Sequence, residues 1–403
     1  MDEVQAQYEA FPYPERDPAD EADRLIEGSP SDPAEIDHYI YGGQRDWSQP
    51  FRVLFAGGGT GDGLIMLASK FQAKGHPVEI VYLDLSEASL EIAKARAEAR
   101  GIDFISFHRD SLLNATDYGA FDYIDCCGVL HHLEDPLVGL RALASALKPD
   151  GGLGAMVYAP LGRRGVYALQ TAFQTLLSGR PVSEQLKPAR AVLEHLNTAH
   201  PFLANPNVSD HKVSDAGFVD LLLHSQDKPF QVEELFELAD AADMRLVSLI
   251  EARLYDPAIY LPSDKDIRQR AAKLSTSQQA ALAENLNGNM KTHIFYLAHK
   301  ANDMKLPSAS SLKLVPRLRG VSAAALAKQV AKEGRLKVTL GGMGMTLPVS
   351  NASSNLIAQC DGKSLSEIAT ALRLSMLDFI KAWTPVHNAL TGVNLLRYSN
   401  GFD

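Results

Sequence analysis

Four glycines, at positions 57, 58, 59 and 61, lie where an apolar run gives way to a helical pattern. Glycine lets the backbone turn tightly and approach a ligand where a Cβ would collide. The helix that follows offers unpaired N–H groups at its N-terminus. The segment 52–63, RVLFAGGGTGDG, therefore predicts a nucleotide-type cofactor site. Asp62 stands where a G-x-G-x-x-G fingerprint has its last glycine, and no G-x-x-x-x-G-K-[ST] loop is present.

Polar residues also follow three later apolar runs. Asp84 ends the run 78–83, about twenty residues beyond the glycines, where a carboxylate can accept hydrogen bonds from ribose hydroxyls. Asp110 and Ser111 follow the run 104–108, and the segment GVLHHLEDP follows the run 121–127. If these runs are parallel strands, their polar ends meet at one edge of a sheet.

The elements that must position these residues alternate between strands and helices. Short, continuously apolar runs at 53–56, 80–83 and 123–127 are typical of strands covered by helices on both faces. Apolar residues recur at helical spacing after the glycines and again after Asp84. We therefore expect an α/β fold with a doubly wound sheet, and a fifth strand over 153–159 after the turn LKPDGG.

This order of segments resembles class I S-adenosylmethionine-dependent methyltransferases over roughly residues 51–160. The resemblance implies a seven-stranded Rossmann-like sheet and S-adenosyl-L-methionine as the cofactor. In that family the glycine turn holds the methionine part, the acids ending strands two and three hold the ribose and adenine, and the loop after strand four borders the methyl group. The cofactor-binding residues that it implies are Ala56, Gly57, Gly58, Gly59, Thr60, Gly61, Asp84, Leu85, Asp110, Ser111, Cys127, Gly128 and Val129.

The sequence departs from the family pattern at two places. An acid usually stands two residues before the first glycine, where this chain has Phe55, so we expect a backbone carbonyl or a residue of the N-terminal segment to hold the amino group of the cofactor instead. The tetrapeptide N/D-P-P-[YF], typical of enzymes that methylate exocyclic base amines, is absent after the fourth run, where CGVL stands. This difference counts against methylation of a nucleic-acid base.

Two segments outside the alternating pattern are candidates for the wall of an acceptor pocket. Residues 1–50 contain the stiff aromatic and proline segment QYEAFPYPERDP, similar to one in a group of largely uncharacterised bacterial methyltransferases; it is interpreted as a lid or as an arm packed on the domain. Residues 160–228 are an insertion with helical patterns at 166–177 and 183–197. The candidate substrate-binding residues are Tyr8, Tyr13, Arg163, Tyr167 and His224, with His211 and Asp227 as further polar residues.

The rest of the chain is divided on composition. Residues 51–300 are expected to form the methyltransferase domain, with strand six at 247–254, a charged helical pair at 264–286 as decoration, and a last strand at 292–299 lying antiparallel between five and six. Residues 301–319 read as a linker. Residues 320–403 are expected to form a small α+β, winged-helix-like unit that supports dimerisation, shields substrate or recognises a peptide.

Methyl transfer from a sulfonium needs alignment and exclusion of water more than a catalytic triad. A base is required when the acceptor carries a proton. His131 follows the fourth run and has an imidazole that titrates in the useful range, so it is the candidate base. A loop histidine bonded to the backbone is the alternative interpretation, and no metal-ligand spacing is present.

Composition limits the choice of partners. The 403 residues carry a formal net charge of −10, which disfavours nucleic acid. Three cysteines give neither a disulfide framework nor a zinc spacing, which fits a reducing cytoplasm. We expect neither a signal peptide nor a membrane span, because no N-terminal apolar run follows a basic start and no stretch of about eighteen apolar residues occurs.

Three functional interpretations follow. The first is a cytoplasmic S-adenosylmethionine-dependent methyltransferase that acts on a small molecule or on a protein or peptide. The second is a nicotinamide-dependent oxidoreductase, which the missing fingerprint glycine and the absence of a Tyr-x-x-x-Lys pair disfavour. The third is a catalytically silent cofactor-binding scaffold, which Phe55 and the extra C-terminal unit favour.

Overall fold

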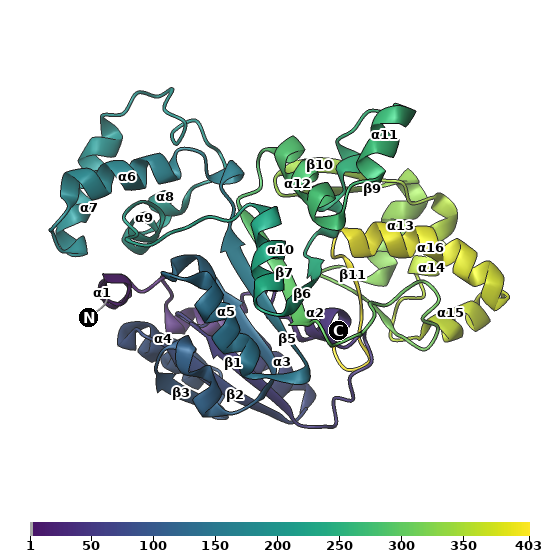
Figure 1. Cartoon of the computed structure of the whole chain (residues 1–403). Coiled ribbons are helices and arrows are strands. Elements are labelled where there is room, and N and C mark those ends of the chain that lie inside the picture. Colours follow the sequence, from purple (N-terminus) through teal and green to yellow (C-terminus); the bar gives the residue numbers. More distant parts are fainter. Residues whose placement is uncertain (1–2) are drawn as a thin grey trace.

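A mixed seven-stranded sheet forms the centre of the computed structural model, which describes residues 3–403 (Figure 1). The strand order is β3-β2-β1-β4-β5-β7-β6, and β7 is antiparallel to both of its neighbours. This arrangement confirms the predicted α/β sheet and its antiparallel last strand. The strands are β1 (Phe51–Ala56), β2 (Val78–Asp84), β3 (Ile105–Arg109), β4 (Phe121–Cys127), β5 (Leu147–Tyr158), β6 (Met244–Leu249) and β7 (Thr292–His299).

Helices cover both faces of this sheet. In β1, Val53 and Phe55 belong to one buried cluster while Leu54 and Ala56 belong to another, so successive side chains enter two separate cores. This two-sided burial explains why the strands read as continuous apolar runs. The helices that flank the sheet are α3 (Asp62–Lys74), α4 (Glu87–Ala99), α5 (Pro136–Ser145) and α10 (Val232–Ala241).

Two strands differ by more than two residues from their predicted limits, which are 153–159 for β5 and 247–254 for β6. Strand β5 begins at Leu147, because Leu147 already pairs with Phe121 of β4. The predicted turn LKPDGG lies inside the strand, as an irregularity in the register between β4 and β5. Strand β6 ends at Leu249, earlier than predicted. Glu251 takes a left-handed conformation with φ of 58°, which turns the chain into a short 3₁₀ helix, Ala252–Tyr255.

The insertion forms a helical lobe beyond the carboxyl ends of the parallel strands (Figure 1). It has its own buried cluster, in which Val166 and Phe173 lie with Phe218 and Leu222. The predicted helix at 166–177 is confirmed, whereas the next one ends at Glu194 instead of residue 197. The helices of the lobe are α6 (Val166–Leu177), α7 (Val182–Glu194), α8 (Asp210–Val213) and α9 (Asp215–Leu222).

The helical pair before β7 contributes to the core and is more than decoration. It consists of α11 (Lys265–Ala272) and α12 (Thr276–Asn287). The buried carboxylate of Glu284 accepts a hydrogen bond of 2.8 Å from the backbone N–H of Val232 and lies 3.1 Å from Nε2 of His293. Glu284 thus satisfies the first turn of α10, which a helix start requires.

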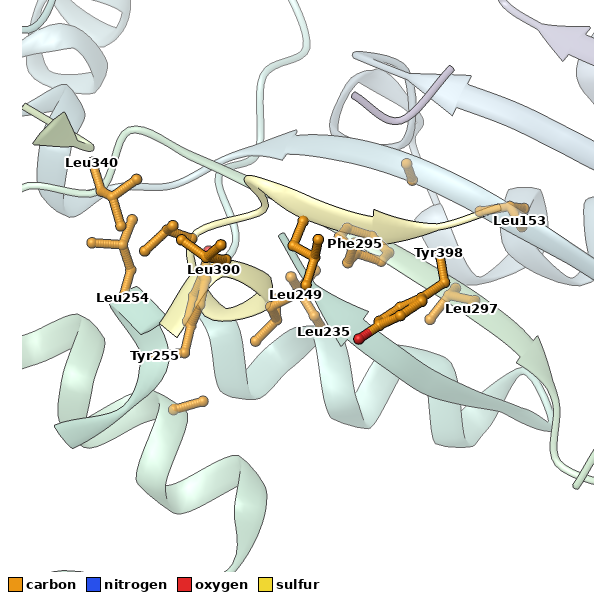
Figure 2. Packing of buried hydrophobic residues seen from close by; sticks show 14 of the residues in the cluster. Leu153, Leu235, Leu249, Leu254, Tyr255, Phe295, Leu297, Leu340, Leu390 and Tyr398 are labelled. Atoms are coloured by element: carbon orange, nitrogen blue, oxygen red, sulfur yellow. The ribbon is translucent and has the colours of Figure 1, made fainter. Parts of the chain in front are cut away.

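The C-terminal part shares a core with the sheet. Figure 2 shows Leu249 and Phe295 of the sheet in one buried group with Leu254, Leu340 and Leu390. In the segment that follows β7, the carbonyls of Asn302 and Met304 accept hydrogen bonds of 2.8 and 3.1 Å from the guanidinium of Arg245 in β6. The C-terminal elements are β8 (Pro316–Leu318), α13 (Ala323–Glu333), β9 (Leu336–Leu340), β10 (Met343–Leu347), α14 (Ser354–Ile357), α15 (Leu365–Ala371), α16 (Met376–Gly392) and β11 (Leu396–Tyr398).

Two antiparallel pairs order this C-terminal part. Strand β9 pairs with β10 as a hairpin, and β11 returns to pair with β8. Because β8 and β11 stand at the two ends of the part, their pairing closes it into one unit. None of the helices within residues 3–403 is long and apolar enough to cross a membrane.

Helix α2 (Pro33–Ile40) connects the C-terminal part to the sheet and is buried along its whole length. Its Glu35 accepts hydrogen bonds from Asn394 at 2.8 Å and Tyr296 at 3.1 Å. The guanidinium of Arg397 in β11 lies 3.0 Å from Asp32 and 3.7 Å from Glu35. Buried charges of this kind are tolerated only when they are paired.

Replacing Arg397 by alanine is expected to lower the free energy of unfolding by about 3 kcal/mol. This loss of stability is at the lower end of the range for a broken buried ion pair. Lys70 and Arg319 still contact the carboxylates of Asp32 and Glu35 in the variant. Urea unfolding of the variant measures this loss. Arg270→Ala is the matched control, because Arg270 pairs only with exposed Asp266. Equal effects of the two substitutions would show that the buried pair does not join the C-terminal part to the sheet.

Candidate functional site

A cavity of about 840 Å³ opens at the carboxyl ends of the parallel strands. Its size is within the range of small-molecule sites in proteins. Four parts of the chain form its walls: the glycine turn, the ends of β2 to β5, the N-terminal segment and the helical insertion. Of the predicted site residues, those that line it are Gly57, Gly58, Gly59, Gly61, Asp84, Leu85, Asp110, Ser111, Cys127, Gly128, Val129, Tyr8, Tyr13 and Arg163.

The glycine turn is packed too closely for side chains. A Cβ on Gly57, which has φ of 74°, would lie 2.7 Å from Cγ2 of Val129, and one on Gly58 would lie 2.4 Å from the ring of Tyr82. The hydroxyl of Tyr82 donates a hydrogen bond of 2.6 Å to the carbonyl of Gly59. Tyr82 of β2 therefore fixes the turn, and the backbone of the turn faces the cavity.

Asp84 is fixed by backbone donors at the end of β2. Its two carboxylate oxygens accept hydrogen bonds from the N–H of Gly59 at 2.8 Å and of Ser86 at 2.9 Å. Burial raises the pKa of this carboxyl. An ionised carboxylate can accept about four hydrogen bonds, so both oxygens keep capacity for hydroxyl groups of a ligand.

Asp110 occupies the corresponding place at the end of β3. Its carboxylate accepts hydrogen bonds from the hydroxyl of Tyr118 and the amide of Asn114, each at 2.8 Å. These bonds lower the pKa of Asp110, so it remains an ionised acceptor. Asp84 and Asp110 thus line the cavity from neighbouring strands, as the sequence predicts for strand ends at one sheet edge.

An acid stands beside Phe55 on the neighbouring strand. Phe55 and Asp125 are register partners in β1 and β4, so their side chains lie on the same face of the sheet. Asp125 lines the cavity and accepts a hydrogen bond of 2.5 Å from the hydroxyl of Ser31. Burial raises the pKa of Asp125 to about 6. The sequence contained this acid in DYIDCC, but strand register was needed to place it.

The N-terminal segment closes over the glycine turn. The hydroxyl of Thr60 donates a hydrogen bond of 2.7 Å to the carbonyl of Pro14. The guanidinium of Arg16 binds both carboxylate oxygens of Asp62, at 2.8 and 2.6 Å, and Arg96 binds the same carboxylate at 2.8 Å. Thr60 therefore faces the segment and does not line the cavity, and neither does Ala56.

Helix α1 (Glu3–Ala10) extends this cover to the insertion. Glu9 accepts hydrogen bonds from the N–H groups of Glu87 at 2.8 Å and Ala88 at 3.1 Å, which are free at the start of α4. On the same helix, Tyr8 donates a hydrogen bond of 3.0 Å to Asp220 of α9. The helix thus contacts both the start of α4 and the insertion.

His131 is buried behind the cavity wall. It packs between His132 and Tyr158, with ring centroids 4.0 and 4.2 Å away, and neither ring nitrogen has a partner. Burial lowers its pKa well below the usual range. His132 lines the cavity instead, and its Nδ1 lies 2.7 Å from the carbonyl of Gln226. A carbonyl only accepts, so Nδ1 of His132 donates this hydrogen bond.

The polar residues of the insertion form one network. Arg163 lies 3.1 Å from Asp227, donates a hydrogen bond of 2.9 Å to the hydroxyl of Tyr167, and stacks on the ring of Tyr158 at 3.6 Å. Tyr167 and His224 lie behind the residues that line the cavity. His211 packs against Phe202 and contributes nothing to the cavity wall.

Two groups of potential metal ligands lie beside the cavity among the described residues. They are His132 with Asp220 and His224, and His131 and His132 with Asp227; within each group the ligand atoms lie within 4.8 Å of one another. In the first group both nitrogens of His224 already have hydrogen-bond partners. In the second, Arg163 supplies positive charge to Asp227. These bonds satisfy much of each group without a cation.

Comparison with known proteins identifies the domain. Residues 54–153 match a family model described as a methyltransferase domain. An uncharacterized protein of Synechococcus is 31% identical over 261 residues, which cover 61% of this chain and 60% of that protein. A demethylmenaquinone methyltransferase of Thermus thermophilus is 33% identical over 111 residues, 28% of this chain and 49% of that enzyme. The chain thus spans about half to three fifths of the length of these relatives.

A solved structure extends the fold comparison to nearly the whole chain. PKMT2 from Rickettsia typhi, in complex with AdoHcy, superposes with a TM-score of 0.63 and 16% identity, covering 92% of this chain and 76% of that one. At this identity the comparison concerns the fold. It includes the insertion and the C-terminal part, which lie outside the family match.

Replacing Arg16 by alanine is expected to loosen the N-terminal segment, because it removes a bidentate bond to Asp62. Amide hydrogen exchange of residues 3–16 should become about tenfold faster. Arg24→Ala is the matched control from the same segment, since the Arg24 and Asp20 side chains are exposed. If both variants exchange at the wild-type rate, Arg16 does not hold the segment.

Proposed function

The chain contains a class I S-adenosylmethionine-dependent methyltransferase domain, and on this premise we propose that it transfers a methyl group from S-adenosylmethionine to an acceptor held under the N-terminal segment. The observation that carries the proposal is that one cavity joins two sets of residues. Asp84 and the glycine turn line one part of it, and Tyr8, Tyr158 and Asp220 line another. A donor and an acceptor bound there would be held as neighbours, which supplies the alignment that methyl transfer needs.

The cofactor half of the cavity fits the chemistry of S-adenosylmethionine. In our proposal the carboxylate of Asp84 accepts hydrogen bonds from the ribose hydroxyls, and Asp110 with Ser111 faces the adenine. The backbone of residues 57–61 lies along the methionine part. Cys127 to Val129 border the sulfonium, which supplies the electrophilic methyl group. All of these residues line the cavity except Thr60, whose side chain binds the N-terminal segment.

Asp125 is proposed to hold the amino group of the cofactor in place of the acid that Phe55 replaces. It lies beside Phe55 in the sheet and lines the same cavity. No lysine, arginine or histidine among residues 3–403 lies within ion-pair distance of its carboxylate. A buried carboxylate without a cation is costly, and a bound ammonium group would offset that cost.

The N-terminal segment and the insertion together cover the acceptor half. Tyr8 from the N-terminal helix bonds to Asp220 of the insertion, so the two segments meet over the cavity. A covered cavity of this kind favours a small molecule, or one extended side chain of a polypeptide that enters it, and it limits the access of water to the reaction. The acidic cavity and the net charge of −10 disfavour a nucleic acid.

Calorimetric titration of the ligand-stripped chain tests the proposal. S-adenosylmethionine and S-adenosylhomocysteine are expected to bind at micromolar concentration, and NAD is not. Asp84→Ala should weaken binding of both sulfur nucleotides by about tenfold to hundredfold, because charge-assisted hydrogen bonds to the ribose are lost. Binding of NAD alone would favour an oxidoreductase, and binding of no nucleotide would favour a silent scaffold.

The raised pKa of Asp125 gives a second prediction. The carboxyl is ionised at pH 7.5 and protonated at pH 5, because its pKa is about 6 in the free protein. Affinity for S-adenosylhomocysteine should therefore fall by about tenfold more between pH 7.5 and 5 in the wild type than in Asp125→Asn. Asp103→Asn, at an exposed position outside the cavity, is the control. Parallel pH profiles of wild type and Asp125→Asn would exclude Asp125 as the partner of the amino group.

A further inference from the structure

Asp220 is a buried carboxylate at the acceptor end of the cavity that forms no ion pair with a lysine or arginine among residues 3–403, and a nitrogen of His132 lies within 4.8 Å of it. Its side chain belongs to α9 and is only 4% exposed. The other buried carboxylate of the insertion, Asp227, lies 3.1 Å from the guanidinium of Arg163. Within residues 3–403, no lysine or arginine nitrogen lies within 4.0 Å of Asp220. A charge in this position is costly unless a ligand supplies the opposite sign.

The direction of the hydrogen bonds shows that Asp220 acts as an acceptor. The N–H of Gln226 donates to Nδ1 of His224 at 3.0 Å, so Nε2 of neutral His224 carries the proton. That nitrogen lies 3.2 Å from the hydroxyl of Tyr8, which in turn donates to Oδ1 of Asp220 at 3.0 Å. Tyr158 donates to Oδ2 at 3.1 Å. Neutral donors therefore hold the carboxylate, and none of them cancels its charge.

Asp220 itself offers acceptor positions to a ligand at this end of the cavity. A carboxylate with two bonds made can accept about two more. His132 lines the same cavity, and its Nδ1 is bonded to the carbonyl of Gln226. Arg163 is already paired with Asp227 and bonded to Tyr167. A ligand here must therefore bring N–H or O–H donors, and a positive charge would complement Asp220.

We propose that the methyl acceptor is a protonated amine and that Asp220 is the residue that binds its ammonium group. The inference rests on the proposed methyl transfer and names its substrate class. An alkylamine is protonated at neutral pH and offers up to three donors, whereas an ionised carboxylate only accepts. A carboxylate or phenolate acceptor would instead place a second negative charge against Asp220.

Methyl transfer to this amine begins with the loss of a proton. The ammonium group gives one proton to the carboxylate of Asp220, which leaves a neutral amine with a free electron pair. That pair forms the bond from nitrogen to the methyl carbon while the bond from carbon to sulfur breaks. The sulfur keeps the bonding electrons and becomes a thioether. Burial raises the pKa of Asp220, which brings its proton affinity closer to that of the amine.

The test uses the full chain and two matched probes. Both are S-adenosylhomocysteine analogues in which nitrogen replaces sulfur; one carries a 3-aminopropyl arm on that nitrogen and the other a 3-hydroxypropyl arm. The aminopropyl probe is expected to bind the wild type at least tenfold more tightly, because its ammonium group reaches Asp220. Asp220→Asn should abolish this preference. Asp215→Asn, on the same helix but exposed, should retain it.

Unmodified S-adenosylhomocysteine separates the inference from the proposed function. If it binds Asp220→Asn as well as wild type, the variant is folded and the loss of preference belongs to the acceptor end. Equal affinities of the two probes for wild type would overturn the amine assignment while methyl transfer stands. Failure of S-adenosylhomocysteine to bind wild type would overturn the proposed function. An Asp220→Asn variant that loses affinity for S-adenosylmethionine alone would place Asp220 at the sulfonium and overturn the inference.

Discussion

The ion pairs around Asp62 are the interaction on which the arrangement of the cavity depends. Asp62 begins α3 directly after the glycine turn and is bound at once by Arg16 of the N-terminal segment and Arg96 of α4. A glutamate of the same segment, Glu21, binds Arg96 at 2.7 Å. Because one carboxylate at a helix start holds both the turn and its cover, the backbone that faces the cofactor and the segment that encloses it are positioned together.

Two kinds of carboxylate line the cavity, and their partners separate them. Asp62 is neutralised by arginines of the protein, whereas Asp84, Asp125 and Asp220 are held by neutral donors. The second kind retains negative charge that the fold does not cancel. In the proposed function these three carboxylates receive the ribose hydroxyls, the cofactor ammonium group and the acceptor. The hydrogen-bond donors that orient them come from elements far apart in the chain.

The C-terminal part completes the core of the sheet and stands away from the cavity. Its strand β11 reaches α2 through Arg397, and α2 in turn contacts the sheet through Glu35 and Tyr296. The segment that follows β7 and the residues around Leu340 share one apolar cluster with β6 and β7 (Figure 2). The winged-helix-like interpretation and the roles in dimerisation or peptide recognition remain predictions.

Local pattern in the sequence determined the sheet, because apolar runs, glycine turns and helical periodicity are properties of neighbouring residues. It located Asp84 and Asp110 at strand ends for the same reason. Only the tertiary structure decided the rest. Strand register set Asp125 beside Phe55, hydrogen bonds placed His132 rather than His131 on the cavity wall, and packing brought Tyr8 to Asp220 across 212 positions of the chain. Contacts of this range leave no periodic trace in the sequence, since they depend on how whole elements pack.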